Sequence, residues 1–211
     1  MDKRMRKRVI MALLGVALGG VCVGIFNKAL LGADPFTVFV TGIGIVFGKG
    51  YGSVYAIVTG VCLLFVFLID KHYIGIATIF NLFGIGTIAE LTMKLLDQFY
   101  HGGPIWVRFL MLIFSLILLC FGSSLYFTAD LGVSAYDAIA LILSKRTPVP
   151  FRFCRIGTDL ICVIIGFICK ATIGIGTVIT AFCMGPIIQW FNLNVAIPIL
   201  EEKKITIKKA K

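Results

Sequence analysis

Long apolar stretches separated by short polar breaks run along almost the whole chain. A helix needs about 20 apolar residues to cross the ~30 Å hydrocarbon core of a bilayer. Six stretches approach or exceed this length, at 9–31, 53–70, 74–96, 105–128, 151–169 and 173–191. Two shorter stretches, 35–48 and 135–144, would cover about 21 Å or less as helices, so neither can cross unaided. The pattern predicts an all-α polytopic membrane protein with six full spans and two short, membrane-buried helices.

The two short stretches open in the same way, each directly after a Leu-Gly turn. In the first, Asp34 is a natural N-cap and Pro35 a natural first helical residue. In the second, Ser134 is the N-cap, and Asp137 stands three residues on, at the spacing of a capping box. A helix, a glycine break and a newly capped short helix therefore occur twice, about 100 residues apart.

The similarity continues beyond these turns. The matched positions are Thr59 with Thr158, 75–78 with 174–177, Gly86 with Gly185, and Glu90 with Gln189. Matching order and spacing predict two tandem repeats, at about 9–96 and 105–191, within a single membrane domain of residues 1–211. Each repeat is expected to consist of a long helix, a short helix and two further helices.

Two topologies remain open at this point. If both short helices cross, the chain has eight crossings and parallel repeats, and 17 of its 20 Lys and Arg residues lie inside. If neither crosses, it has six crossings and inverted repeats, and 15 of the 20 lie inside. The distribution of positive charge favours eight crossings, whereas segment length favours six. Both topologies place the two termini in the cytosol.

Composition supports a membrane protein. Hydrophobic residues make up 59% of the chain and charged residues 14%, too few to form the surface of a soluble domain. The net charge of +10 is concentrated in the tails 1–8 and 200–211, which is typical of cytoplasmic flanks beside anionic lipid and does not indicate nucleic-acid binding. The seven cysteines form no C-x-x-C pair, so we predict neither a disulfide nor a metal site.

The paired turns L-G-x-x-[PA]-[FY] at 31–36 and 131–136, with the G-I-[AG]-T segments at 75–78 and 174–177, resemble the YczE/YyaS/YitT-like family of bacterial integral membrane proteins. The resemblance covers about residues 9–191 and implies a location in the bacterial cytoplasmic (inner) membrane. It adds no catalytic residue. The aromatic-Asp pair associated with that family stands at Tyr136-Asp137, whereas the first half has Phe36-Thr37 in its place.

Polar and ionisable side chains at membrane depth are costly and therefore indicate candidate sites. The candidates for substrate binding are Asp137, Glu90, Asn81, Gln189, Ser134 and Asp34. Several also have a structural interpretation. Asp137 could accept a hydrogen bond from the Ser134 backbone as a cap, Glu90 could pair with Lys94, and Asn81 could bond a neighbouring helix. Arg155 and Asp159 are four residues apart and predict an ion pair on one helix face.

Two functions follow as hypotheses. The first is a small-solute transporter or permease with its site between the repeats, because short helices at matching places in two repeats indicate such a site. The alternative is a membrane partner that transports nothing and stabilises or regulates another complex. The expected partners are the lipid bilayer with either a small molecule or a membrane protein. No hydrolase, metalloprotease or Walker A motif occurs, so we expect no enzyme, catalytic residue or cofactor.

Overall fold

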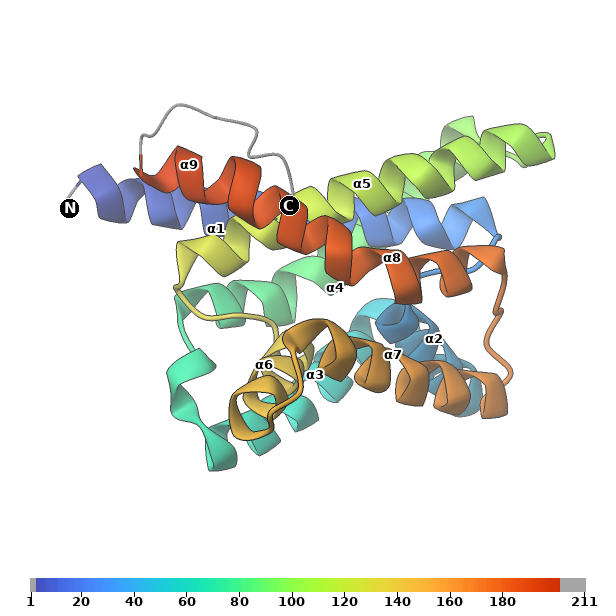
Figure 1. Cartoon of the computed structure of the whole chain (residues 1–211). Helices are drawn as coiled ribbons and strands as arrows, with labels where there is room; N and C mark the ends of the chain where they lie inside the picture. Colours follow the sequence, from blue (N-terminus) through green and yellow to red (C-terminus); the bar gives the residue numbers. More distant parts are fainter. Residues whose placement is uncertain (1–2, 202–211) are drawn as a thin grey trace.

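The computed structural model describes residues 3–201, and within that range the chain forms helices and no strands (Figure 1). The α-helices are α1 (Lys3–Ala29), α2 (Pro35–Phe47), α3 (Tyr51–Ile69), α4 (Ile76–Phe99), α5 (Ile105–Ala129), α6 (Ala135–Arg146), α7 (Phe151–Ile168), α8 (Ile175–Phe191) and α9 (Ile197–Glu201). A 3-10 turn, η1 (Lys71–Tyr73), precedes α4, and a π-helical turn, η2 (Asn192–Ala196), joins α8 to α9. The predicted all-α class is confirmed.

Five helical segments within this range are long and apolar enough to cross a membrane, rather than the predicted six. They are Arg4–Ala29, Tyr51–Ile69, Ile76–Phe99, Ile105–Ala129 and Ile175–Glu201. The remaining predicted span, 151–169, is helical as α7, but it carries Arg152, Arg155 and Asp159 within its 18 residues. Charge in that helix, rather than an error in its limits, accounts for the difference.

The two ends of the described chain lie at the same end of the molecule, here called the N-terminal end. Leu200 in α9 packs against the cluster that contains Met11 of α1 (Figure 1). Helix α1 already begins at Lys3, so residues 3–8 of the predicted basic tail are helical. Of the predicted C-terminal tail 200–211, Leu200 and Glu201 are helical in α9, and residues 202–211 lie outside the described residues.

Helix α1 packs along α4 and α5, and it runs antiparallel to α5 (Figure 1). The α1–α5 contact is close where two glycines meet. A Cβ atom on Gly15 would lie 2.5 Å from the carbonyl oxygen of Gly122. Small residues at such a crossing let two membrane helices approach closely. Below this pair, α2 packs on α7 and α3 packs on α6.

The loops after α1 and α5 make matching contacts with the starts of α8 and α4. Gly176 donates its backbone N–H to the Leu31 carbonyl (2.8 Å), and Ala77 donates its own to the Leu131 carbonyl (3.0 Å). Each loop then turns at a glycine, Gly32 with φ +97° and Gly132 with φ +102°. This backbone region favours glycine, which explains the Leu-Gly pair in both turns.

Two arginines cap the C-termini of the two long helices. Arg108 donates to the carbonyl oxygens of Ala29 (2.7 Å) and Leu30 (2.9 Å), at the end of α1. Arg8 donates to those of Ala129 (2.5 Å) and Asp130 (2.7 Å), at the end of α5. The last carbonyls of a helix lack partners within the helix, and a guanidinium both satisfies them and complements the helix dipole.

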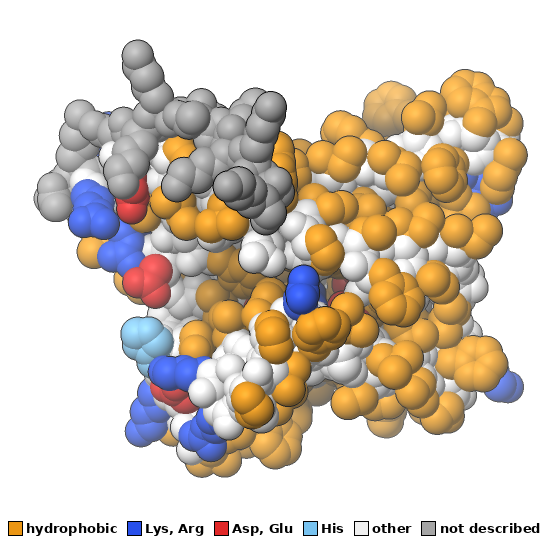
Figure 2. Space-filling model, viewed as in Figure 1, with side chains coloured by type: hydrophobic (Ala, Val, Ile, Leu, Met, Phe, Trp, Pro, Cys, Tyr) orange, Lys and Arg blue, Asp and Glu red, His pale blue; other side chains and the backbone are white. Residues whose placement is uncertain are grey.

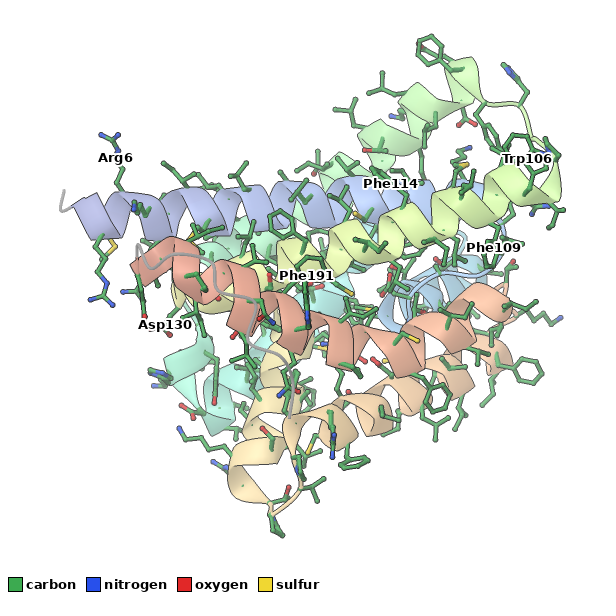
Figure 3. The ribbon with its side chains drawn as sticks, turned by 45° about the horizontal axis from the view of Figure 1, so that its top comes forward. Arg6, Trp106, Phe109, Phe114, Asp130 and Phe191 are labelled. Atoms are coloured by element: carbon green, nitrogen blue, oxygen red, sulfur yellow. The ribbon has the colours of Figure 1, made fainter. Side chains whose placement is uncertain are left out.

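Apolar side chains cover most of the visible face, and charged side chains gather mainly at its N-terminal edge (Figure 2). Trp106, Phe109 and Phe114 project outward from α5 (Figure 3), with exposed fractions of 63%, 46% and 58%. Apolar surface this extensive is unfavourable in water and favourable in lipid. The outer surface therefore fits a chain embedded in a bilayer.

Candidate functional site

The N-termini of the short helices α2 and α6 come together in the interior. Asp34 accepts a hydrogen bond from the Thr37 backbone (3.1 Å), and Ser134 accepts one from the Asp137 backbone (3.1 Å). Both predicted N-caps are thus confirmed. One residue into each helix, the rings of Phe36 and Tyr136 stack at a centroid distance of 4.6 Å. The stacked rings join the two helix starts directly.

A cavity of about 60 Å³ lies beside these helix starts. Its polar lining residues are Asp34, Thr37, Tyr51, Tyr55, Thr59, Asn81, Ser123, Tyr126, Ser134, Tyr136, Asp137 and Arg155. Four of the six predicted binding residues, Asp34, Asn81, Ser134 and Asp137, are therefore brought together at one cavity. At roughly 10–15 Å³ for each water-sized sphere, it has room for about four to six small atoms or molecules.

One wall of the cavity carries a buried ion-pair cluster centred on Arg155, which is 5% exposed. Its guanidinium bonds Asp137, and its Nε lies 3.2 Å from Oδ1 of Asp159. The Tyr136 hydroxyl also donates to Asp159. The predicted Arg155–Asp159 pair is thus confirmed. A buried charge needs partners of this kind because it has lost its hydration.

Asp137 corrects the predicted capping box. Its Oδ2 accepts hydrogen bonds from the hydroxyls of Ser134 (2.7 Å) and Tyr126, while Oδ1 accepts one from Arg155. The expected bond from the Ser134 backbone N–H to the Asp137 carboxylate is therefore replaced. Charge-assisted bonds are stronger than neutral ones, so the guanidinium determines where this carboxylate points.

Asp34 has a different environment. Its carboxylate accepts hydrogen bonds from the Thr37 hydroxyl (2.6 Å) and the Thr37 backbone, and it pairs with no basic side chain among residues 4–201. It is 7% exposed and lines the cavity. The cluster therefore contains three carboxylates, those of Asp34, Asp137 and Asp159, and one guanidinium, which contacts only the last two.

A second wall presents polar atoms that have no partner in the described chain. The Tyr55 hydroxyl donates to Oδ1 of Asn81 (2.9 Å), as predicted for an interhelical bond from Asn81. The Asn81 Nδ2 and the Thr59 hydroxyl are buried without a hydrogen-bond partner, although both residues line the cavity. Leaving such groups unpaired costs about 1–3 kcal/mol each, so a bound molecule that pairs with them gains affinity.

The other two predicted binding residues lie outside the cavity. Glu90 accepts a hydrogen bond from the Gly52 backbone N–H (2.8 Å) and so caps the start of α3, where Gly50 has no side chain to do so. Its predicted ion pair with Lys94 does not form among the described contacts. Gln189 is exposed on α8. The prediction linked the two residues because they stand at matching positions of the two repeats. A match in sequence does not show whether a side chain points toward the cavity or away from it.

The tyrosines Tyr51, Tyr55 and Tyr126 were missed as site residues. All three line the cavity, and the Tyr51 hydroxyl lies 3.4 Å from the Thr37 hydroxyl. Within an apolar run, a tyrosine gives the same pattern as a core aromatic, so the sequence held no signal for them. Arg155 was predicted only as a partner of Asp159. An arginine within an apolar stretch is itself a signal of a functional site, and this signal could have identified Arg155 as a cavity residue.

All-helical architecture, a lipid-facing outer surface and a buried charged cluster define the class: an integral membrane protein. A family model described as "Family of unknown function (DUF6198)" matches residues 6–193, and the chain belongs to this family. It is 28% identical over 201 residues to an uncharacterized protein of Haemophilus influenzae, covering 94% of this chain and 89% of the relative. It is 26% identical over 185 residues to the uncharacterized membrane protein YczE of Bacillus subtilis, covering 86% and 82% respectively. No solved structure matches the chain.

Proposed function

We propose that this protein is a small-solute transporter whose binding site is the cavity between two inverted repeats. The observation that carries the proposal is the buried polar cavity where the N-termini of α2 and α6 meet. Charged groups inside a membrane protein are expensive, and they are retained where they line a path or a site. Short helices that begin at the centre of a membrane protein are a recurrent device for binding solutes.

Residues that lie 100 positions apart in the sequence make equivalent contacts, and this supports the two repeats. Arg8 caps the end of α5, and Arg108 caps the end of α1. The Leu31 loop meets the start of α8, and the Leu131 loop meets the start of α4. These contacts are reciprocal between the halves. Because α1 and α5 run antiparallel, repeats that begin with these helices would be inverted rather than parallel.

The positions of basic residues support this topology and cytoplasmic termini. Arg4, Arg6, Lys7 and Arg8 begin α1 at the N-terminal end, where Arg8 also pairs with Asp130 (2.8 Å). Lys71 follows α3 at the same end, as the inverted arrangement requires. Lys28 and Arg108 lie at the opposite end, at the junction of α1 with α4 and α5. The end richer in Lys and Arg faces the cytosol in most membrane proteins. We therefore place both termini inside a bacterial cytoplasmic membrane.

The proposal assigns transport and no catalytic chemistry. The described cavity groups are engaged in ion pairs and hydrogen bonds or stand ready to bond a solute, and none is arranged as a nucleophile beside a base. A structural membrane partner has little need of an interior cluster of three carboxyl groups and a guanidinium, because buried ion pairs rarely stabilise a fold more than apolar residues of similar volume.

The test is solute flux in proteoliposomes, measured across a panel of radiolabelled metabolites. We expect wild-type protein to exchange at least one solute and Asp137→Asn to lose most of this flux. The matched control is Asp97→Asn, which changes an exposed aspartate that pairs with Lys28 outside the cavity. Absence of flux for every solute, combined with stoichiometric capture of a second membrane protein in mild detergent, would support the accessory role instead.

A further inference from the structure

We infer that the cavity binds a small protonated amine carrying a hydroxyl group, with Asp34 as the counter-ion of the amine. The inference names the solute class of the proposed transporter. It rests on the proposed function only in taking the bound amine to be transported. It follows from four features of the cavity: its charge, its aromatic wall, its unpaired polar atoms and its size.

The charge of the buried cluster calls for a cation. Asp34, Asp137 and Asp159 contribute three negative charges when ionised, and Arg155 contributes one positive charge. Arg155 already contacts Asp137 and Asp159, so Asp34 is the carboxylate left without a cation. An unpaired buried charge is strongly unfavourable, and a ligand ammonium group would neutralise it. Thr37 occupies one site on each Asp34 oxygen, and a carboxylate has about four, which leaves room for ammonium donors.

Aromatic rings stand around Asp34 and suit an organic cation. Phe36 lies edge-on to Tyr55 at a centroid distance of 5.8 Å, and Tyr51 lies 5.8 Å from Tyr55. All three residues line the cavity. Aromatic faces attract ammonium groups, and the attraction increases when both are shielded from water. The protein uses the same interaction internally, because Arg155 lies over the ring of Tyr136 at 4.5 Å.

The unpaired atoms of Asn81 and Thr59 indicate a second polar group on the ligand. Asn81 is 1% exposed and Thr59 is 2% exposed, so water at the protein surface does not satisfy them. A hydroxyl both donates and accepts, and it therefore pairs with the Asn81 amide in either orientation and with the Thr59 hydroxyl. These two buried side chains, on α4 and α3, are an observation independent of the acidic cluster.

The volume of the cavity suits a ligand of a few atoms. A cavity of about 60 Å³ accommodates roughly four to six non-hydrogen atoms. Ethanolamine, with a single ammonium and a single hydroxyl on two carbons, has the required groups within this size, so it serves as the test probe. Ethylamine lacks the hydroxyl, ethylene glycol lacks the charge, and glycolate reverses the charge. These three compounds separate the contribution of the hydroxyl group to binding from that of the positive charge.

The experiment titrates each probe into the purified full-length protein and records the shift in melting temperature and the Kd by calorimetry. We expect ethanolamine to raise the melting temperature and ethylamine to bind about 10-fold more weakly, since the buried groups then stay unpaired. Ethylene glycol and glycolate should cause no shift. A shift with potassium chloride alone and none with any amine overturns the inference, as does equal binding of ethanolamine and glycolate.

Two variants locate the contacts. Asp34→Asn keeps an N-cap of similar strength, so the protein should fold while ethanolamine binding weakens by at least about 10-fold. Asn81→Leu should bring the affinities of ethanolamine and ethylamine together. Asp97→Asn is the control and should bind as the wild type does. Unchanged ethanolamine binding in folded Asp34→Asn protein overturns the assignment of the counter-ion.

The outcome is separable from the test of transport. Amine binding without any flux leaves this inference standing and removes the proposed function, whereas flux of a solute without amine binding does the reverse. Repeating the titration in nanodiscs with and without phosphatidylethanolamine identifies the source of the amine. Competition by that lipid points to a head group, and no competition points to a free solute.

Discussion

The N-termini of α2 and α6 have the same backbone design and opposite electrostatics. Each follows a Leu-Gly turn, carries a side-chain cap and places an aromatic ring in the stacked pair Phe36–Tyr136. At α6 the carboxylate lies one turn into the helix, where Arg155 neutralises it. At α2 the carboxylate is the cap itself and pairs with no cation among residues 4–201.

The difference originates in the following helix. At the offset of 99 that matches Thr59 with Thr158, Ala56 and Gly60 stand opposite Arg155 and Asp159. Helix α3 therefore lacks the charges that α7 provides. Two helix starts of similar backbone design thus differ in charge, and Asp34, whose carboxylate pairs with no basic side chain among residues 4–201, lies on the cavity wall.

The largest expected effect comes from removing Arg155, the buried cation of the cluster. Arg155→Met should lower the free energy of unfolding by about 3–5 kcal/mol, because Asp137 and Asp159 are then buried without a cation. Denaturant unfolding in detergent micelles measures it. The control is Arg152→Met, which changes an exposed arginine three residues earlier. A loss no larger than that of the control would mean that the N-termini of α2 and α6 do not differ electrostatically.

The two glycine turns should be equally sensitive, which tests the shared frame. Gly32→Ala and Gly132→Ala each force a side chain into a positive-φ conformation, and the new Cβ would lie 2.5 Å from Thr177 or Thr78. We expect each to cost about 1–3 kcal/mol. Gly60→Ala, where a Cβ meets nothing within 4 Å, should be neutral or stabilising. A cost confined to one of the turns would break the equivalence.

Removing either arginine cap should have a smaller and similar effect. Arg8→Gln and Arg108→Gln each delete the guanidinium at a helix C-terminus, with an expected loss of about 1 kcal/mol, since both sites are partly exposed. Thermal unfolding of the two variants, measured side by side, shows whether their losses of stability are equal. Arg6, which points away from the protein in Figure 3, provides the control Arg6→Gln. A large effect of one variant alone would argue against reciprocal capping.

The smallest loss of stability is expected at the unpaired carboxylate of Asp34. Asp34→Asn should leave the free energy of unfolding unchanged or raise it, because asparagine caps a helix about as well as aspartate and carries no unpaired buried charge. Calorimetric unfolding of this variant beside Asp137→Asn sharpens the comparison, since the latter leaves Arg155 with one partner fewer. Similar losses in both variants would contradict the view that Asp137 has a cationic partner and Asp34 lacks one.

Much of the fold could be predicted from the sequence. The short stretches 35–48 and 135–144 correspond to α2 and α6, and both caps follow from residue type and spacing. These features are local, and local propensity determines them. Five of the six predicted spans are long and apolar enough to cross; the sixth, α7, is helical but carries three charges, to which the prediction gave less weight than to length. Whether α1 and α5 run antiparallel depends on packing between distant segments, which no local pattern reveals.

The candidate site was predicted in part. Asp34, Ser134, Asn81 and Asp137 meet at the cavity because polar side chains in a membrane interior collect where they can pair. Glu90 was a polar residue with a local use, capping α3. The tyrosine hydroxyls and the position of Arg155 between two aspartates arise from tertiary packing, and only the structure reveals them.

The exchange of arginine caps between α1 and α5 has a consequence for the origin of such a chain. Under the proposed repeat, one half carries both partners of the same bond: an arginine at the start of its long helix and free carbonyls at the end. Two copies of that half, inserted in opposite orientations, would satisfy each other without any further residue. The duplicated chain would then be a fused antiparallel dimer, and after fusion each half would be free to mutate separately. Arg155 and Asp159, which correspond to Ala56 and Gly60 at the offset of 99, show what such divergence would produce.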